Sequence, residues 1–155
     1  MIFTATSDEV HGEAAGAAWQ MGWAVEDQEP LAEHVRSPDD ARRLLGPRFR
    51  WAETEKVVVL HVGDAQRLLA VGEYPGSADA ADLPLRDIVA DALRLGSTGL
   101  VLAHNHPSGD AEPSQADLRT SRLLADTVRN LGIRLIDHLI FAGEDVRSLR
   151  DLGLL

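Results

Sequence analysis

Two histidines one residue apart, His104 and His106, stand where an apolar run of the sequence ends in a Pro/Gly turn. Side chains two residues apart on a strand point to the same face, so the two imidazoles are expected side by side. Asp117 follows after a short loop, in the first turn of a predicted helix. Two imidazoles and one carboxylate form the kind of ligand set that a catalytic zinc uses, with its fourth position left for water. The residue types therefore indicate a hydrolytic metal centre.

The same stretch has a purely structural interpretation. Ser114 and Asp117 form the pattern Ser-x-x-Asp, a capping box that starts helices, and taken alone the pattern is typical of a cap. An H-x-H pair alone is also a weak signal. The cap leaves the two histidines unexplained, however, and the two interpretations do not exclude each other. A residue at a helix start can point back toward the end of the preceding strand.

A zinc hydrolase also needs a general base near its water, and three glutamates are candidates: Glu53, Glu55 and Glu73. Glu55 opens the apolar run ETEKVVVLHV and alternates onto the face of Val57 and Val59, which is expected to be the core side. A carboxylate there is costly without a partner, and water on a metal is such a partner. The alternative is a solvated carboxylate at a strand start.

The elements expected around these residues alternate between helix and strand. Ser37 is predicted to cap a helix that has Pro38 at its first position. Further along, the pattern predicts the strand EKVVVLHV, the turn GDAQ, the antiparallel strand RLLAVGEY, the loop PGSADAAD, the helix LPLRDIVADALRLGS, the strand TGLVLAHNH, a helix from Ser114 to about Leu131, and the strand IRLIDHLIFAG with VRSLRDLGLL packed behind it. This order predicts an α/β fold with a mixed β-sheet flanked by helices.

The length of 155 residues favours one domain. Residues 1–36 are acidic and weakly periodic, and we expect an N-terminal extension of unassigned role, with either a helix around Ala14–Met21 or little fixed structure. Residues 37–155 are the predicted domain.

Composition limits the classes of partner and cofactor. The formal net charge of −10 disfavours binding to phosphate backbones, so nucleic acid is not an expected partner. The chain has no cysteine, which excludes disulfides and thiolate metal sites and fits a cytoplasmic protein. It shows neither a secretory signal nor a run of membrane-span length, so no membrane association is expected.

The spacing of His104, His106, Ser114 and Asp117 resembles the JAMM motif of the JAB/MPN metalloproteases: H-x-H, seven residues, S, two residues, D. The longer segment LAHNHPSGDAEPSQAD resembles the RadC-like branch of that family, which carries HNHPSG followed by PS-x-x-D. The runs LPLRDIVADAL, LGIRLIDHLIF and EKVVVLHVGDAQRLL also resemble that branch. The resemblance covers roughly residues 37–155.

This resemblance implies the α/β sandwich of the JAB/MPN fold, which is similar to that of cytidine deaminases. It implies zinc held by His104, His106 and Asp117, with Glu55 as the base that deprotonates a water and Ser114 as the donor that steadies the tetrahedral oxyanion. The implied activity is that of a zinc metallopeptidase that hydrolyses peptide or isopeptide bonds in a protein or peptide substrate.

Two other functions compete with this hypothesis. Some MPN domains lack the ligands and serve only as interaction modules, whereas here the ligands are intact. A DNA-repair association is the other, since RadC-like proteins usually carry an N-terminal helix-hairpin-helix module that contacts DNA. No such hairpin is recognisable in residues 1–36, and three adjacent letters HNH are not the longer ββα unit of HNH nucleases. The segment after Tyr74 also departs from the family pattern, which affects substrate recognition more than metal binding.

Some site assignments stay open at this stage. The choice of Glu55 rests on counting strand positions, so Glu53 is the alternative base. Asp110 lies in the loop, but its place in the motif is not a ligand place. Asp137 and His138 are expected at a strand end, either as partners of a zinc ligand or as satisfied core residues.

Overall fold

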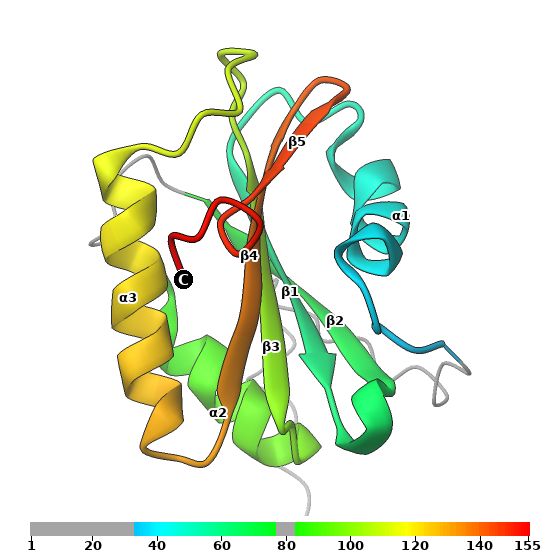
Figure 1. Ribbon diagram of the computed structural model, residues 1–155, viewed down its shortest axis with the longest axis vertical. Helices are drawn as coiled ribbons and strands as arrows, with labels where there is room; N and C mark the ends of the chain where they lie inside the picture. The colour runs from blue at the N-terminus through cyan, green and yellow to red at the C-terminus, as the bar shows by residue number, and fades with distance from the viewer. Residues whose placement is uncertain (1–32, 77–82) are drawn as a thin grey trace, which may run out of the picture.

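A five-stranded mixed sheet crosses the protein, with one helix on one face and two helices on the other, as Figure 1 shows for the computed structural model. The structure describes residues 33–76 and 83–155. The elements are α1 (Pro38–Phe49), β1 (Lys56–Val62), β2 (Leu68–Pro75), α2 (Leu85–Leu95), β3 (Gly99–Asn105), α3 (Gln115–Arg129), β4 (Arg134–Ala142) and β5 (Asp145–Ser148). The predicted α/β fold is confirmed, while the helix considered at Ala14–Met21 lies outside the described residues.

The strands follow the order β2-β1-β3-β4-β5 across the sheet. Only β3 and β4 run parallel, and the other neighbours are antiparallel. Parallel neighbours need a crossover connection, which α3 supplies. As a result, the end of β3 and the start of α3 are joined by one short loop at the same end of the sheet.

Alternation along the strands divides the buried residues between two faces. The face covered by α1 buries Val58, Leu60, Val101, Ala103, Leu139 and Phe141 of the sheet. The face covered by α2 and α3 buries Val57, Val59, Tyr74, Leu100, Leu102 and Leu135. The expectation that Val57 and Val59 face a core is therefore confirmed, and the face under α2 and α3 is the one that carries His104.

Both α1 and α3 begin with a capping box. Ser37 pairs with Asp40 in α1, and Ser114 pairs with Asp117 in α3, each serine oxygen accepting the backbone N–H of the aspartate. The cap predicted at Ser37 is confirmed. The helix start of α3 is thus fixed by the same residues that the motif assigns to chemistry.

The C-terminal run differs from the expectation. VRSLRDLGLL was expected to pack behind β4, but Asp145–Ser148 form β5, which pairs with β4 at the edge of the sheet. The two strands are joined by Gly143 and Glu144, because Ala142 and Asp145 are partners. Gly143 has φ 61, which glycine adopts without strain and which makes so tight a hairpin possible.

The last residues of the expected extension pack on the domain. Leu68 N donates to Glu33 O and Val35 N donates to Gln66 O, both at 2.9 Å, and Val35 is buried against the core under α1. No helix in residues 33–76 and 83–155 is long and apolar enough to cross a bilayer.

Candidate metal centre

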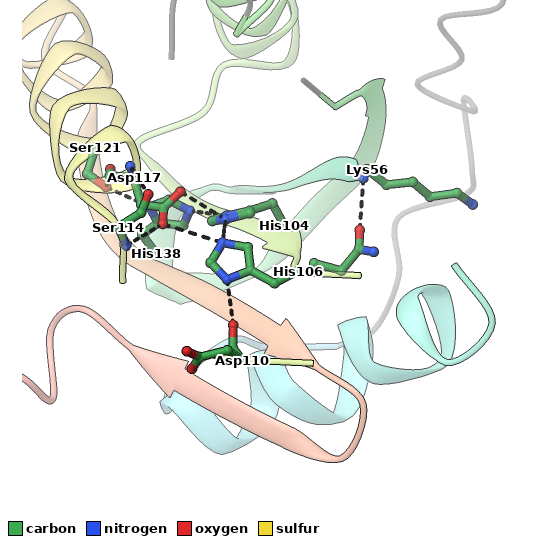
Figure 2. A network of polar contacts seen from close by, with 9 residues as sticks. Lys56, His104, His106, Asp110, Ser114, Asp117, Ser121 and His138 are labelled. Atoms are coloured by element: carbon green, nitrogen blue, oxygen red, sulfur yellow. Dashed lines mark hydrogen bonds and ion pairs between the residues drawn. The ribbon is translucent and has the colours of Figure 1, made fainter. Parts of the chain in front are cut away.

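His104, His106 and Asp117 meet where β3 ends and α3 begins. His104 Nε2 lies 3.0 Å from Asp117 Oδ1, and His106 Nε2 lies 3.4 Å from Asp117 Oδ2. The two Nε2 atoms are 2.9 Å apart. Figure 2 shows the three side chains pointing toward one another. One ligand atom from each lies within 4.8 Å of the others, so the group could hold a metal ion.

The hydrogen-bond partner of His106 decides which of its nitrogens is free. Its Nδ1 lies 2.7 Å from the carbonyl oxygen of Asp110, an oxygen that can only accept. The proton of neutral His106 therefore resides on Nδ1, and the lone pair of Nε2 points toward Asp117. This is the tautomer that a metal-binding imidazole needs.

His104 is oriented by a longer chain of contacts. Its Nδ1 lies 2.8 Å from His138 Nε2, and His138 Nδ1 lies 2.6 Å from Ser121 Oγ. Ser121 in turn donates its hydroxyl proton to Asp117 O at 2.7 Å. If each group donates to the next, every proton has an acceptor and the Nε2 lone pair of His104 is left for the site. Two lone pairs and a carboxylate then converge with no proton between them, which fits a bound cation.

Burial keeps His138 neutral. His138 is buried, and the loss of solvent followed by the nearby His104 holds its pKa well below its ordinary value. Burial on its own would raise the pKa of Asp117, but the close contact with His104 and the hydrogen bonds with Ser114 outweigh it and hold that pKa well below its ordinary value. Asp117 is thus an anion, the state in which a carboxylate binds a metal.

Ser114 and Asp117 serve the helix and the site together. Ser114 N donates to Asp117 Oδ2 at 2.7 Å, and Asp117 N donates to Ser114 Oγ at 3.1 Å. The carboxylate Oδ1 is left to face His104. Ser114 is exposed, and its oxygen acts as an acceptor in the cap, so its own proton is available to another acceptor. The cap interpretation is confirmed, and it does not remove Asp117 from the site.

The three candidate bases occupy different places. Glu55 is half-buried immediately before β1, and its side chain has no hydrogen-bond or ion-pair partner in the part of the chain that the structure describes. The β1–β3 register pairs Val57 with His104, so continuing it by two residues sets Glu55 opposite His106. Glu53 is exposed in the preceding bend. Glu73 is paired with Val58 on the α1 face, across the sheet from the histidines.

A family model described as RadC-like JAB domain matches residues 35–154. The chain belongs to this family. A UPF0758 protein of Marinobacter nauticus is 37% identical over 142 residues, which are 90% of this chain and 63% of the relative. A UPF0758 protein of Thioalkalivibrio sulfidiphilus is 39% identical over 122 residues, which are 78% of this chain and 54% of the relative. The chain therefore spans between about half and two thirds of the length of these curated relatives. The resemblance seen in the sequence is confirmed at the level of the family.

Asp137 and His138 of this RadC-like JAB domain lie inside β4 and not at a strand end as expected. The register between β3 and β4 shifts between Leu100 and Val101, where one extra residue of β4 is inserted. Such a bulge reverses the alternation of side chains beyond it. His138 is thereby turned toward His104.

Because of the bulge, Asp137 and His138 have different partners. His138 contacts a candidate ligand, whereas the Asp137 carboxylate accepts bonds from Ser148 Oγ at 2.6 Å, His138 N at 2.7 Å and Arg150 N at 3.2 Å. Asp137 is thus a satisfied core residue of the RadC-like JAB domain. Asp110 contributes its backbone oxygen to His106, while its carboxylate accepts from Glu112 N.

Sequence reasoning missed Ser121 and the role of Asn105. The only local sign of Ser121 was a polar residue on a helix face that is otherwise buried by Leu124 and Val128. Asn105 is buried and binds two carbonyl oxygens of the segment that precedes β1 and the N–H of Lys56, the first residue of β1. Both residues act through contacts that are distant in sequence.

Proposed function

We propose that this RadC-like JAB domain is a zinc-dependent hydrolase of peptide or isopeptide bonds. The observation that carries the proposal is the convergence of two imidazole lone pairs and one carboxylate, with each imidazole Nδ1 assigned to a hydrogen bond on its far side. Nitrogen and oxygen donors in a group of three match the protein ligands of hydrolytic zinc sites.

His104, His106 and Asp117 would hold the ion. When bound, zinc supplies a Lewis acid that lowers the pKa of a water to near neutrality and polarises a carbonyl. Glu55 would accept a proton from the attacking water and would return it to the nitrogen as the C–N bond breaks. Ser114, exposed at the start of α3, donates its hydroxyl proton to the carbonyl oxygen as negative charge develops there.

The decisive measurement combines metal content with peptide and isopeptide cleavage by the purified protein. Glu55→Gln should keep its zinc and lose about 10²–10⁴-fold in rate, because a glutamine amide cannot take the proton. Glu53→Gln is the matched control and should stay active. A protein that neither contains zinc nor takes it up contradicts the proposal. If Glu53→Gln is inactive and Glu55→Gln is not, Glu53 is the base.

The same experiments separate the competing functions. Zinc binding without cleavage of any peptide or isopeptide substrate would favour an interaction module. For a nucleic-acid partner, the net charge of −10 predicts no gel shift at moderate salt, and tight binding would revive the DNA-repair hypothesis.

A further inference from the structure

Asn105, the residue between the two histidines, has a side chain that binds the segment carrying Glu55. Its Oδ1 accepts the N–H of Lys56 at 2.8 Å. Its Nδ2 donates to Thr54 O at 3.0 Å and to Ala52 O at 3.5 Å. The amide is buried, so these contacts replace those that water would otherwise make. The side-chain amide of Asn105 thus forms hydrogen bonds with the backbone on both sides of Glu55.

These contacts begin where the strand pairing stops. The backbone ladder between β1 and β3 runs from Val62 and Gly99 to Val57 and His104, and no further pair follows. Beyond it, the side chain of Asn105 takes the place of a strand partner. These contacts fix the backbone on both sides of Glu55, at the position that the β1–β3 register, if continued, sets opposite His106.

Gly76 lies against the backbone of Glu55 on the β2 side. β1 pairs Lys56 with Pro75, so the next step in register sets Gly76 opposite Glu55. A Cβ atom at position 76 would lie 2.5 Å from both the carbonyl carbon and the oxygen of Glu55, and 2.8 Å from Lys56 N. These are backbone atoms, which cannot rotate away as a flexible side chain can. The Glu55 backbone therefore lies between a hydrogen-bonding amide and a position that tolerates no side chain.

We propose that Asn105 and Gly76 are positioning residues that hold Glu55 at the distance from the metal centre that proton transfer requires. The inference rests on the proposed function, since it gives Glu55 its role as base. Neither residue touches the substrate in this scheme. Displacing a reacting group by about 1 Å can cost on the order of 10²-fold in rate, so the backbone support has a measurable consequence.

The test uses Asn105→Ala, Asn105→Asp and Gly76→Ala, with Ser97→Ala as the control. Ser97 is buried and bonds His61 beyond the opposite end of β3, so its loss removes a buried hydrogen bond away from the site. Asn105→Ala and Gly76→Ala should lower kcat by about 10²-fold while KM and zinc affinity stay unchanged. Asn105→Asp keeps the acceptor for Lys56 but turns a carboxylate oxygen toward two carbonyl oxygens, so its kcat should fall at least as far as that of Asn105→Ala. Ser97→Ala should keep the wild-type kcat.

A double-mutant cycle separates positioning from general damage. In the Glu55→Gln background, Asn105→Ala should cause little further loss, because the group that it positions is already absent. An equal loss in both backgrounds would show that Asn105 does not act through Glu55. Hydrogen exchange gives a readout without catalysis: the Lys56 amide should exchange at least about tenfold faster in Asn105→Ala, with thermal unfolding measured in parallel.

Failure of this inference is distinct from failure of the proposed function. If the wild type cleaves substrate and both Asn105→Ala and Gly76→Ala match its kcat, the positioning role is wrong and the hydrolase stands. If the wild type cleaves nothing, the hydrolase proposal fails. In that case, if the Lys56 amide exchanged at the wild-type rate in Asn105→Ala, Asn105 would not hold the backbone beside Glu55 either.

Discussion

The sheet face under α2 and α3 carries buried histidines near both ends of β3. The polar side chains at the two ends differ in how their hydrogen-bonding atoms are paired. His61 lies opposite Leu100, near the start of β3, whereas His104 lies near its end. Both histidines are buried, and both have an aspartate nearby. Burial and composition therefore do not distinguish the two ends.

The polar atoms around His61 form a closed chain. Ser97 Oγ lies 3.2 Å from His61 Nδ1, His61 Nε2 lies 3.4 Å from Tyr74 OH, and Tyr74 donates to Asp91 Oδ2 at 2.8 Å. Asp91 then pairs with Arg94. Each ring nitrogen of His61 has a hydroxyl partner that can both donate and accept, so no lone pair is left over. This end of the sheet is a satisfied core network.

At the other end the lone pairs converge. His104 and His106 both turn their Nε2 atoms to Asp117, and both place Nδ1 on an acceptor. The direction in which the lone pairs point, and not the number of buried histidines, marks this end as the site for a cation.

The largest effect is expected from removing a ligand. Asp117→Ala or His104→Ala should abolish zinc binding and hydrolysis together, because two remaining ligands do not form a hydrolytic zinc site. His61→Gln should leave zinc content unchanged. Metal analysis after dialysis checks both, and zinc retained in full by Asp117→Ala would invalidate the assigned ligand set.

A smaller effect is expected from the partner of His104. His138→Leu removes the acceptor of the His104 Nδ1 proton and should weaken zinc affinity by about 10–100-fold. His138→Gln offers an amide oxygen in the same direction and should recover part of that loss. Competition with a zinc chelator measures the affinities. Equal affinity in wild type and His138→Leu would show that the contact does not orient His104.

The His61 network should appear in the pH dependence of stability. Burial lowers the pKa of His61 to about 4 from an ordinary value of 6.5. The unfolded chain binds a proton near pH 6.5 but the folded chain does not, so stability is complete above pH 6.5 and is lost as pH falls toward 4.

Over that window the wild type should lose roughly 3 kcal/mol more than His61→Gln. Denaturant titrations at pH 7, 5.5 and 4 provide the comparison. Other titrating groups are shared by the two proteins and cancel. Parallel pH profiles for the two proteins would contradict a neutral buried His61.

The smallest effect is expected from Tyr74→Phe, which removes the hydroxyl that bonds Asp91 and faces His61. The free energy of unfolding should fall by about 1 kcal/mol, the usual worth of one hydrogen bond. Zinc affinity and kcat should not change. A loss of zinc in this variant would mean that the His61 network and the candidate metal centre are coupled and not independent.

The three candidate ligands were predictable as a group because their signals are local. The period of two sets His104 and His106 on one side, and the first turn of the next helix brings Asp117 back to the strand end. The mixed sheet also followed from the order of elements. In each case the physical rule acts within one element or between neighbours in the chain.

The supporting residues were not predictable in the same way. Counting by two from Leu135 leads to Asp137, and only the bulge opposite Leu100 and Val101 brings His138 to the site. That bulge depends on how two strands pair, which no local pattern specifies. Alternation along β3 turns Asn105 away from the histidines, but no local pattern shows that its partners are carbonyls that precede β1. β5 is only four residues long and gave too few positions for a period.

The repeated capping box has a consequence for how such a domain changes during evolution. α1 starts with Ser37 and Asp40, where the carboxylate does nothing beyond its own turn, and α3 starts with the same pair of residue types. Glutamate is the usual residue at the N3 position of a capping box, so the helix alone would accept it at position 117. Its extra methylene would carry the carboxylate past the imidazoles. A descendant with glutamate at position 117 would keep the helix start but not the converging group of His104, His106 and a carboxylate, so the residue at this one position would show whether the group is intact.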